Sequence, residues 1–255
     1  MDRFNIMSRA EYKDVQEDKG DIILLGLAGS HSYGTNVEGS DIDIRGIRYN
    51  ELDMLLGLKE PSQYTAPDTD STIFDLNKAI PLLAKCNPNM IEMLGLEEED
   101  YILLDNDGRD LIDNADMFLS QDCVKNAFGG YARAQLKRLQ NGLKSDGHSV
   151  KKDDNHLSKH AMHLVRLLLM GTEILRTGQI HTRRKGEELA LLKEIRAGQY
   201  LKAGQMDYKF YELTTKLEYD FNMAYTNSQL PDKPDWDRIN RFLFQVNYET
   251  IMRKV

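Results

Sequence analysis

The sequence LGLAGSHSYGTNVEGSDIDI, residues Leu25 to Ile44, joins two predicted strands through a loop that contains glycine and serine. The first strand is an apolar run, Ile22 to Leu27, whose length and composition predict that it is buried. Ala28-Gly29-Ser30 opens the loop, and Ser40 to Ile44 returns as a neighbouring strand in which acids alternate with isoleucines. We therefore expect a sheet in which the loop and the two acids lie close together.

Asp41 and Asp43 are predicted to form a divalent-metal site. Residues i and i+2 of a strand share a face, so both carboxylates point one way while Ile42 and Ile44 point into the core. Two adjacent carboxylates repel each other, and one would stay protonated unless a cation offset the charge. Because the ligands would be oxygens alone, we expect Mg²⁺ or Mn²⁺ rather than zinc.

The loop that precedes the two acids is predicted to hold a phosphate. Gly29 lets an anion approach the backbone, and Ser30 offers a hydroxyl and an N–H. A helical turn starting near His31 would direct further N–H groups at the anion. The alternative is that Gly29 and Ser30 form a plain turn, and that the two acids are the solvent-facing side of an edge strand.

Length and composition indicate a soluble protein with one large domain or two small ones. The chain has 255 residues, of which 41% are hydrophobic and 29% are charged. No apolar run approaches the ~20 residues of a membrane span, and the first residues lack the apolar core of a signal peptide. We therefore expect a cytoplasmic protein. Cys86 and Cys123 are expected to be free thiols, although the sequence leaves a disulfide open.

Charge is distributed unevenly along the chain. Residues 1–120 carry 10 basic and 25 acidic side chains, whereas residues 121–200 carry 15 basic and 8 acidic ones. An acidic, metal-binding part beside a basic part suits a polyanionic substrate that is presented to a cation site. Two oppositely charged parts that simply attract each other would explain the pattern equally well.

The predicted elements divide the chain into a mixed part, residues 1–119, and a helical part, residues 120–255. Strands are predicted over residues 21–28, 40–49 and 71–76. Residues 61–70 are expected to form a loop, and residues 141–154 a mobile loop. Glu92 is expected to be exposed on its helix. Helices are predicted over residues 8–20, 77–86, 90–96, 111–119, 123–143, 156–175, 189–198, 200–228 and 236–252.

Basic side chains gather on two of these helices. Arg133 and Lys137 lie on the helix over residues 123–143, and Lys159, His163 and Arg166 share one face of the helix over residues 156–175. These five residues are candidates for contacts with phosphate or RNA. A solvated helix face is the simpler alternative, and a zinc site at His163 and its neighbour His160 is not favoured because no acid or cysteine faces them.

The Gly-Ser loop, ten further residues and Asp41-Ile42-Asp43 together resemble the signature of the DNA polymerase β nucleotidyltransferase superfamily. Other segments, in this order, are similar to the nucleotidyltransferases of an RNA repair pathway, which are predicted partners of RNA ligases. The matching stretches are Gly29–Thr35, Ser40–Gly46, Asn87–Leu94, Tyr131–Lys137 and His160–Leu168.

The resemblance implies an α+β fold: a small mixed sheet with flanking helices, forming a catalytic domain, followed by a helical domain. It implies transfer of a nucleoside monophosphate from a nucleoside triphosphate, such as ATP, to an acceptor hydroxyl on an RNA end, with an RNA ligase as a partner. Gly29, Ser30 and Ser40 would bind the nucleotide, and Asp41 and Asp43 would bridge two Mg²⁺ ions.

Superfamily members also take a third carboxylate from a strand beside the Asp-x-Asp strand, where it binds the metal and draws the proton from the attacking hydroxyl. Asp75, at the end of the third predicted strand, is the first candidate and Asp70 the second. The alternative is that Asp75 caps the following helix.

Two other functions stay open at this point. The acceptor could be a hydroxyl of a protein or of a small molecule, in which case RNA would have no effect. The chain could also be a nucleotide-binding module without catalysis, although such a module needs no paired carboxylates.

Overall fold

The computed structural model describes residues 21–66, 69–141 and 154–255. The helix expected over Ser8 to Gly20 and most of the expected mobile loop lie outside these residues. The chain forms two compact units. The first contains the described residues up to Leu119 together with His181–Arg183 and Pro234–Val255, and the second contains Ser120–Ile180 and Arg184–Lys233.

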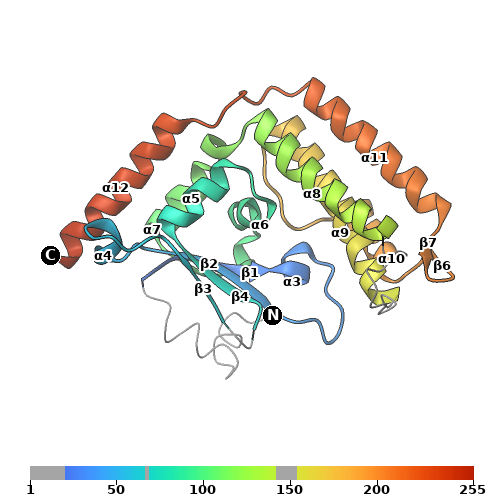
Figure 1. Cartoon of the computed structure of the whole chain (residues 1–255), viewed down its shortest axis with the longest axis horizontal. Helices are drawn as coiled ribbons and strands as arrows, with labels where there is room; N and C mark the ends of the chain where they lie inside the picture. The colour runs from blue at the N-terminus through green and yellow to red at the C-terminus, as the bar shows by residue number, and fades with distance from the viewer. Residues whose placement is uncertain (1–20, 67–68, 142–153) are drawn as a thin grey trace. The chain divides into compact units, whose positions relative to one another are not determined.

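The first unit is built on a five-stranded mixed sheet within the described residues, with the strand order β3-β4-β2-β1-β5 (Figure 1). Only β2 and β4 run parallel, and the other neighbours are antiparallel. The expected α+β fold is therefore confirmed. Because β2 is central and begins at Asp43, Asp43 does not belong to an edge strand, whereas Asp41 lies before the strand. The strands are β1 Ile22–Ala28, β2 Asp43–Arg48, β3 Gln63–Thr65, β4 Ser71–Asp75 and β5 Tyr101–Leu104.

Strand β1 is buried along its whole length, as its apolar composition predicts. Leu25 and Leu27 point to the same face and form one apolar cluster with Ile44 of β2 and Ile73 of β4. Burial of each such side chain stabilises the fold by roughly 1.5–3 kcal/mol. The cluster fixes the register of β2, because a slip of one residue would bring Asp43 into the core.

Helices cover one face of this sheet, and α5 and α12 lie side by side above it (Figure 1). Arg238 of α12 forms a bidentate ion pair with Asp116, and the amide of Asn247 donates to Asn77 at the start of α5 over 3.0 Å. The C-terminal helix therefore belongs to the first unit, whereas we expected one continuous helical domain after residue 119. The helices of the first unit are α3 Gly29–Tyr33, α4 Leu52–Leu55, α5 Leu76–Ala84, α6 Pro88–Ile91, α7 Asn106–Asp113 and α12 Trp236–Lys254.

The second unit is helical, and α9 Asp154–Thr177 packs against α8 Gln121–Asn141, α10 Gly186–Arg196 and α11 Tyr208–Thr226. Gly171 allows the close approach of these helices, because a Cβ there would lie 2.9 Å from the Cβ of Phe128 and 2.7 Å from the ring of Phe221.

The helix expected to begin at Tyr200 begins instead at Tyr208. A short hairpin of two strands, β6 Leu201–Lys202 and β7 Gln205–Met206, precedes it. The turn of this hairpin places Ala203 and Gly204 at positive φ, which a helix does not allow.

Two further expectations can be compared with the structure. Neither Cys86 nor Cys123 forms a disulfide with another described residue. No helix in the described ranges is long and apolar enough to cross a lipid bilayer.

Candidate active site

A five-residue helix, α3, follows β1 directly and contains Gly29 and Ser30 of the predicted phosphate loop. Gly29 has a φ of +59°, a conformation that suits glycine, so the chain can turn sharply where the strand ends. The hydroxyl of Ser32 donates to the carbonyl of Gly29 over 3.0 Å, and the N–H of Thr35 donates to the carbonyl of Ser30 over 3.0 Å. The helical turn expected near His31 is therefore present.

The C-terminal residue of α3, Tyr33, is hydrogen-bonded to a buried residue of the first unit. The hydroxyl of Tyr33 donates to Oε2 of Glu92 over 2.8 Å, and both side chains are buried. The carbonyl of Glu92 in turn accepts a hydrogen bond from the hydroxyl of Thr182 over 2.7 Å. The expectation that Glu92 is exposed is therefore wrong, because its carboxylate anchors the loop helix.

Asp43 and Gly29 lie against each other. The register places Asp43 opposite Ala28, the last residue of β1. A Cβ built on Gly29 would lie 1.7 Å from Oδ2 of Asp43, so the carboxylate occupies the space that any side chain at position 29 would need. The fold thus brings the predicted phosphate loop and one predicted metal ligand into direct contact.

The other residues of the motif lie in the loop between α3 and β2 or at its ends. Asp41 precedes β2 and is exposed, whereas Asp43 is half-buried. The hydroxyl of Ser40 accepts a hydrogen bond from the N–H of Val37 over 2.9 Å and thereby closes the turn that leads into β2. The nearer ring nitrogen of His31 lies 3.4 Å from the carbonyl oxygen of Ser40 and links the start of the loop to its end.

Asp75 lies away from this contact, which corrects the expectation that it joins the acid pair. Asp75 is opposite Arg48 in the parallel register, five residues beyond Asp43 and therefore about 16 Å along the strand. Its carboxylate is completely buried and accepts hydrogen bonds from Nε of Arg48 over 2.7 Å and from the N–H of Ser62 over 2.6 Å. Asp75 occupies the N-cap position of α5, but its side chain makes no capping hydrogen bond.

The start of β4, not its end, lies level with Asp43. Ser71 pairs with Ile44, so Asp70, the residue before Ser71, precedes β4 as Asp43 precedes Ile44 in β2. Asp70 is exposed. Within the described ranges, no cluster of three or more His, Cys, Asp or Glu side chains is arranged to hold a metal ion. Asp41 and Asp43, which carry oxygen donors only, remain the predicted metal ligands.

Arg45 is a further polar residue of this face, and it is not among the site residues predicted above. It follows Asp43 by two residues, so both side chains project from the same side of β2. Its guanidinium Nη1 donates to the carbonyl of Asn89 in α6 over 2.9 Å. The i, i+2 spacing from Asp43 is the signal that could have identified it.

The comparison with known families agrees with this arrangement. The model of the RNA repair pathway DNA polymerase beta family, RlaP, matches residues 6–245. The chain belongs to this family. Membership supports nucleotidyltransferase activity of the polymerase β type in general, and it suggests that nucleic acid is involved. No curated protein matches the chain.

Three of the five basic residues singled out in the sequence are exposed on the helical unit of the RlaP chain: Arg133 and Lys137 on α8 and Lys159 on α9. Arg166 is completely buried, which corrects the expectation that it belongs to a solvent-facing set. Its guanidinium donates to Nδ1 of His163 over 3.1 Å. Burial, reinforced by the positive charge of Arg166, holds the pKa of His163 well below its usual range.

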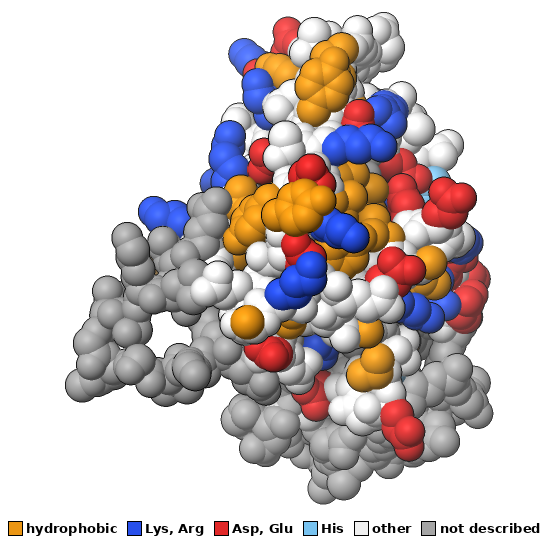
Figure 2. Space-filling model, turned by 90° about the vertical axis from the view of Figure 1, so that its right-hand side faces the viewer, with side chains coloured by type: hydrophobic (Ala, Val, Ile, Leu, Met, Phe, Trp, Pro, Cys, Tyr) orange, Lys and Arg blue, Asp and Glu red, His pale blue; other side chains and the backbone are white. Residues whose placement is uncertain are grey.

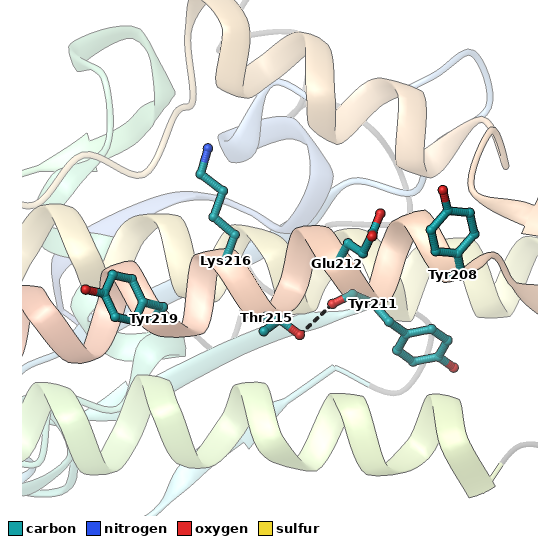
Figure 3. A pocket seen from close by; sticks show the side chains of 6 residues that line it. All are labelled: Tyr208, Tyr211, Glu212, Thr215, Lys216 and Tyr219. Carbon is teal, nitrogen blue, oxygen red and sulfur yellow. Dashed lines mark hydrogen bonds between the residues drawn. The ribbon is translucent and has the colours of Figure 1, made fainter.

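An open groove of about 670 Å³ on the RlaP chain is lined by α11 and lies outside the loop and acid pair. Its side chains spread along the helix instead of converging on one point, and the hydroxyl of Thr215 is bonded to the carbonyl of Tyr211 (Figure 3). The molecular face in Figure 2 shows a hydrophobic patch among side chains of both charges. Neither feature has the uniform charge expected of a phosphate-binding surface. The groove is lined by Tyr208, Tyr211, Glu212, Thr215, Lys216 and Tyr219.

Proposed function

We propose that the protein transfers a nucleoside monophosphate from a nucleoside triphosphate, with ATP as the first candidate, to a hydroxyl at an RNA end. The observation that carries the proposal is the contact between Gly29 and the carboxylate of Asp43. A phosphate held at the Gly29 turn would lie next to that carboxylate. Membership of an RNA repair family supports RNA as the acceptor.

The residues of the site fit a hard divalent cation. Mg²⁺ is commonly bound through one or two carboxylates together with substrate phosphates, which matches an exposed Asp41, a half-buried Asp43 and an adjacent phosphate loop. Asp41 and Asp43 would hold one or two Mg²⁺ or Mn²⁺ ions. Such ions would neutralise phosphate charge and lower the pKa of the attacking hydroxyl. Gly29 and Ser30 would position the phosphates, and Ser40 would keep the loop closed.

Asp70 replaces Asp75 as the proposed third carboxylate. The support is that Asp70 directly precedes Ser71, which pairs with Ile44, the residue after Asp43, and that Asp70 is exposed. Asp75 is buried against Arg48 and could reach neither the substrate nor the metal without breaking that ion pair.

The transfer itself needs positioning more than covalent catalysis. The acceptor hydroxyl oxygen forms a bond to the α-phosphorus, and the bond between that phosphorus and the oxygen bridging to the β-phosphate breaks. Pyrophosphate leaves, and the hydroxyl proton passes to the carboxylate of Asp70 and then to solvent. The half-buried Asp43 and the fixed α3 turn would align the α-phosphorus for attack along the line of the breaking bond.

The exposed Arg133, Lys137 and Lys159 are proposed to contact the RNA backbone. Neutralising phosphates with lysine and arginine releases counterions, so binding would weaken steeply as salt is raised. An RNA ligase is proposed as a partner in the same repair reaction, since joining ends is the complementary step to modifying one.

The test is transfer of label from each α-³²P nucleoside triphosphate to RNA or protein in the presence of Mg²⁺. We expect labelled RNA with the native protein and a loss of about two orders of magnitude or more with Asp43→Asn and Asp70→Asn. Glu38→Gln is the matched control, because Glu38 is an exposed acid in the same loop and has no proposed role.

Other outcomes would replace the proposal. Label found in protein, with no effect of RNA, would identify a protein side chain as the acceptor. ATP binding that survives Asp41→Ala, with no labelled product from any nucleotide, would indicate a binding module. Full activity of Asp43→Asn would remove the assigned roles altogether.

A further inference from the structure

Arg45 stands out among the arginines of the first unit by what its guanidinium contacts. Its only hydrogen bond in the described part of the chain goes to a backbone carbonyl, that of Asn89, over 2.9 Å. By contrast, most arginines of this unit are paired with a carboxylate. These are Arg48 with Asp75, Arg109 with Glu98, Arg183 with Asp100, Arg238 with Asp116 and Arg253 with Asp107.

The position of Arg45 is fixed by the same strand that carries the metal-binding candidate. Arg45 and Asp43 project from one face of β2, about 6.6 Å apart along the strand. The bond to Asn89 holds the guanidinium at the start of α6, and Asn89 is exposed there. Arg45 itself is half-buried, so its charge is partly shielded from water but open to a ligand that approaches this face.

A guanidinium has five N–H donors in a planar fork, and the bond to Asn89 uses one of them. The remaining donors match the oxygens of a phosphate, which arginine binds with two parallel hydrogen bonds. The nearby Asp43 would repel an anion unless a cation lay between them. An anion at Arg45 is therefore favoured when that anion also brings a divalent cation to Asp43.

We propose that Arg45 binds the triphosphate tail of the nucleotide and holds the two phosphates that leave as pyrophosphate. The inference rests on the proposed function, because it takes the metal and the α-phosphate to lie at Asp43 and Gly29. Negative charge grows on the departing pyrophosphate as the bond to the α-phosphorus breaks. A fixed guanidinium at that place stabilises the charge without having to reorganise.

The competing explanation is that Arg45 only fastens β2 to α6. Three substitutions separate the two roles. Arg45→Lys keeps the positive charge, Arg45→Gln keeps a donor for the Asn89 carbonyl without the charge, and Arg45→Met removes both. Phosphate binding predicts that Lys is the mildest change, whereas a purely structural role predicts that Gln is at least as mild as Lys.

The experiment measures binding of inorganic tripolyphosphate and of ATP, each with Mg²⁺ and without acceptor, by titration calorimetry. We expect Arg45→Gln to weaken both by about 10- to 100-fold and Arg45→Lys to weaken them less. The urea midpoint of each variant is measured in parallel to show that it is folded. Arg109→Gln is the control, because Arg109 is exposed and paired with Glu98, and it is expected to bind as the native protein does.

Failure of this inference differs from failure of the proposed function. If the native protein transfers label and Arg45→Gln binds tripolyphosphate as tightly as the native protein, Arg45 does not hold the tail and only the inference falls. If the native protein neither binds any nucleoside triphosphate with Mg²⁺ nor transfers label, both the proposed function and the role of Arg45 are wrong. Equal loss of binding in the Lys and Gln variants, with lowered urea midpoints in both, would assign Arg45 to structure alone.

Discussion

Nε of Arg48 lies 2.7 Å from Oδ1 of Asp75, and this ion pair is buried in the sheet at the end of β2 and β4 remote from the candidate active site. The N–H and the hydroxyl of Ser62 also donate to Oδ2 of Asp75, over 2.6 and 3.0 Å. With these bonds both oxygens of the carboxylate are satisfied. Asp75 therefore joins β4 to β2 and to the segment before β3.

Replacing Asp75 is expected to destabilise the fold instead of acting on catalysis alone. Asp75→Asn leaves the buried Arg48 without its counter-charge, and breaking a buried pair in this way costs about 3–5 kcal/mol. Asp70→Asn, at an exposed position, should change the free energy of unfolding by less than about 0.5 kcal/mol. Urea unfolding of the two variants measures the difference. A variant Asp75→Asn that unfolds like the native protein but transfers no label would return Asp75 to the list of catalytic candidates.

Gly29→Ala should abolish activity because of the space that Asp43 fills. The added Cβ would meet Oδ2 of Asp43 at 1.7 Å, so the carboxylate would have to turn away from the loop. Gly39→Ala is the matched control: Gly39 also has a positive φ, +80°, but a Cβ there has no neighbour within 4 Å. Both variants should lose about 1–2 kcal/mol of stability from the strained backbone.

Only Gly29→Ala should also lose label transfer and the binding of Mn²⁺, measured by electron paramagnetic resonance. Equal activity of the two variants would mean that the contact between Gly29 and Asp43 plays no part in the reaction.

The central part of the fold could be predicted from sequence because its signals are local. The apolar run of β1 and the acid–isoleucine alternation at the start of β2 each follow from the chemistry of adjacent residues. Strand β3 could not be found this way. Gln63–Thr65 is only three residues long, too short for its polar–aromatic–polar alternation to stand out, and it pairs with β4.

The dependence on contacts between distant parts of the chain also explains why some predictions about individual residues are wrong. Asp75 lies at the end of a strand, as a third carboxylate should, but only the parallel register of β2 and β4 reveals at which end of the sheet it lies. Arg166 occupies a helical position that continues the face of Lys159, yet tertiary packing buries it. Glu92 was expected to be exposed because a single carboxylate normally is, and no local signal points to its partner Tyr33, 59 residues earlier in the chain.

Tyr33→Phe should loosen the loop helix by removing one hydroxyl. The change removes the 2.8 Å hydrogen bond that the buried carboxylate of Glu92 accepts from Tyr33. Loss of a hydrogen bond to a buried carboxylate lowers the free energy of unfolding by about 1–3 kcal/mol. Tyr225→Phe also removes a hydroxyl that donates to a carboxylate, that of Asp122, but this bond is exposed and its loss should cost little. Urea unfolding compares the two variants. Equal midpoints would show that the buried bond does not hold α3 in place.

His163 should contribute to the change of the free energy of unfolding with pH. Arginine can only donate, so Nδ1 of His163, which lies 3.1 Å from the guanidinium of Arg166, must be unprotonated in the folded chain. Burial comes first among the causes that hold the pKa of His163 well below its usual range, followed by the positive charges of Arg166, His160, Arg138 and Lys159.

Below a pH of about 6.5 the imidazole of His163 binds a proton in the unfolded chain, whereas it stays neutral in the folded chain because its pKa there is lowered. The free energy of unfolding should therefore fall as the pH is lowered, by at most about 1.4 kcal/mol per pH unit from this one group. His163→Gln, which can still accept a hydrogen bond from Arg166, should make the profile between pH 7 and 5 flatter. His156→Gln, at an exposed position on the same helix, is the matched control. If both variants kept the native slope, a charged imidazole would have to be accommodated beside Arg166, and the acid sensitivity would have another source.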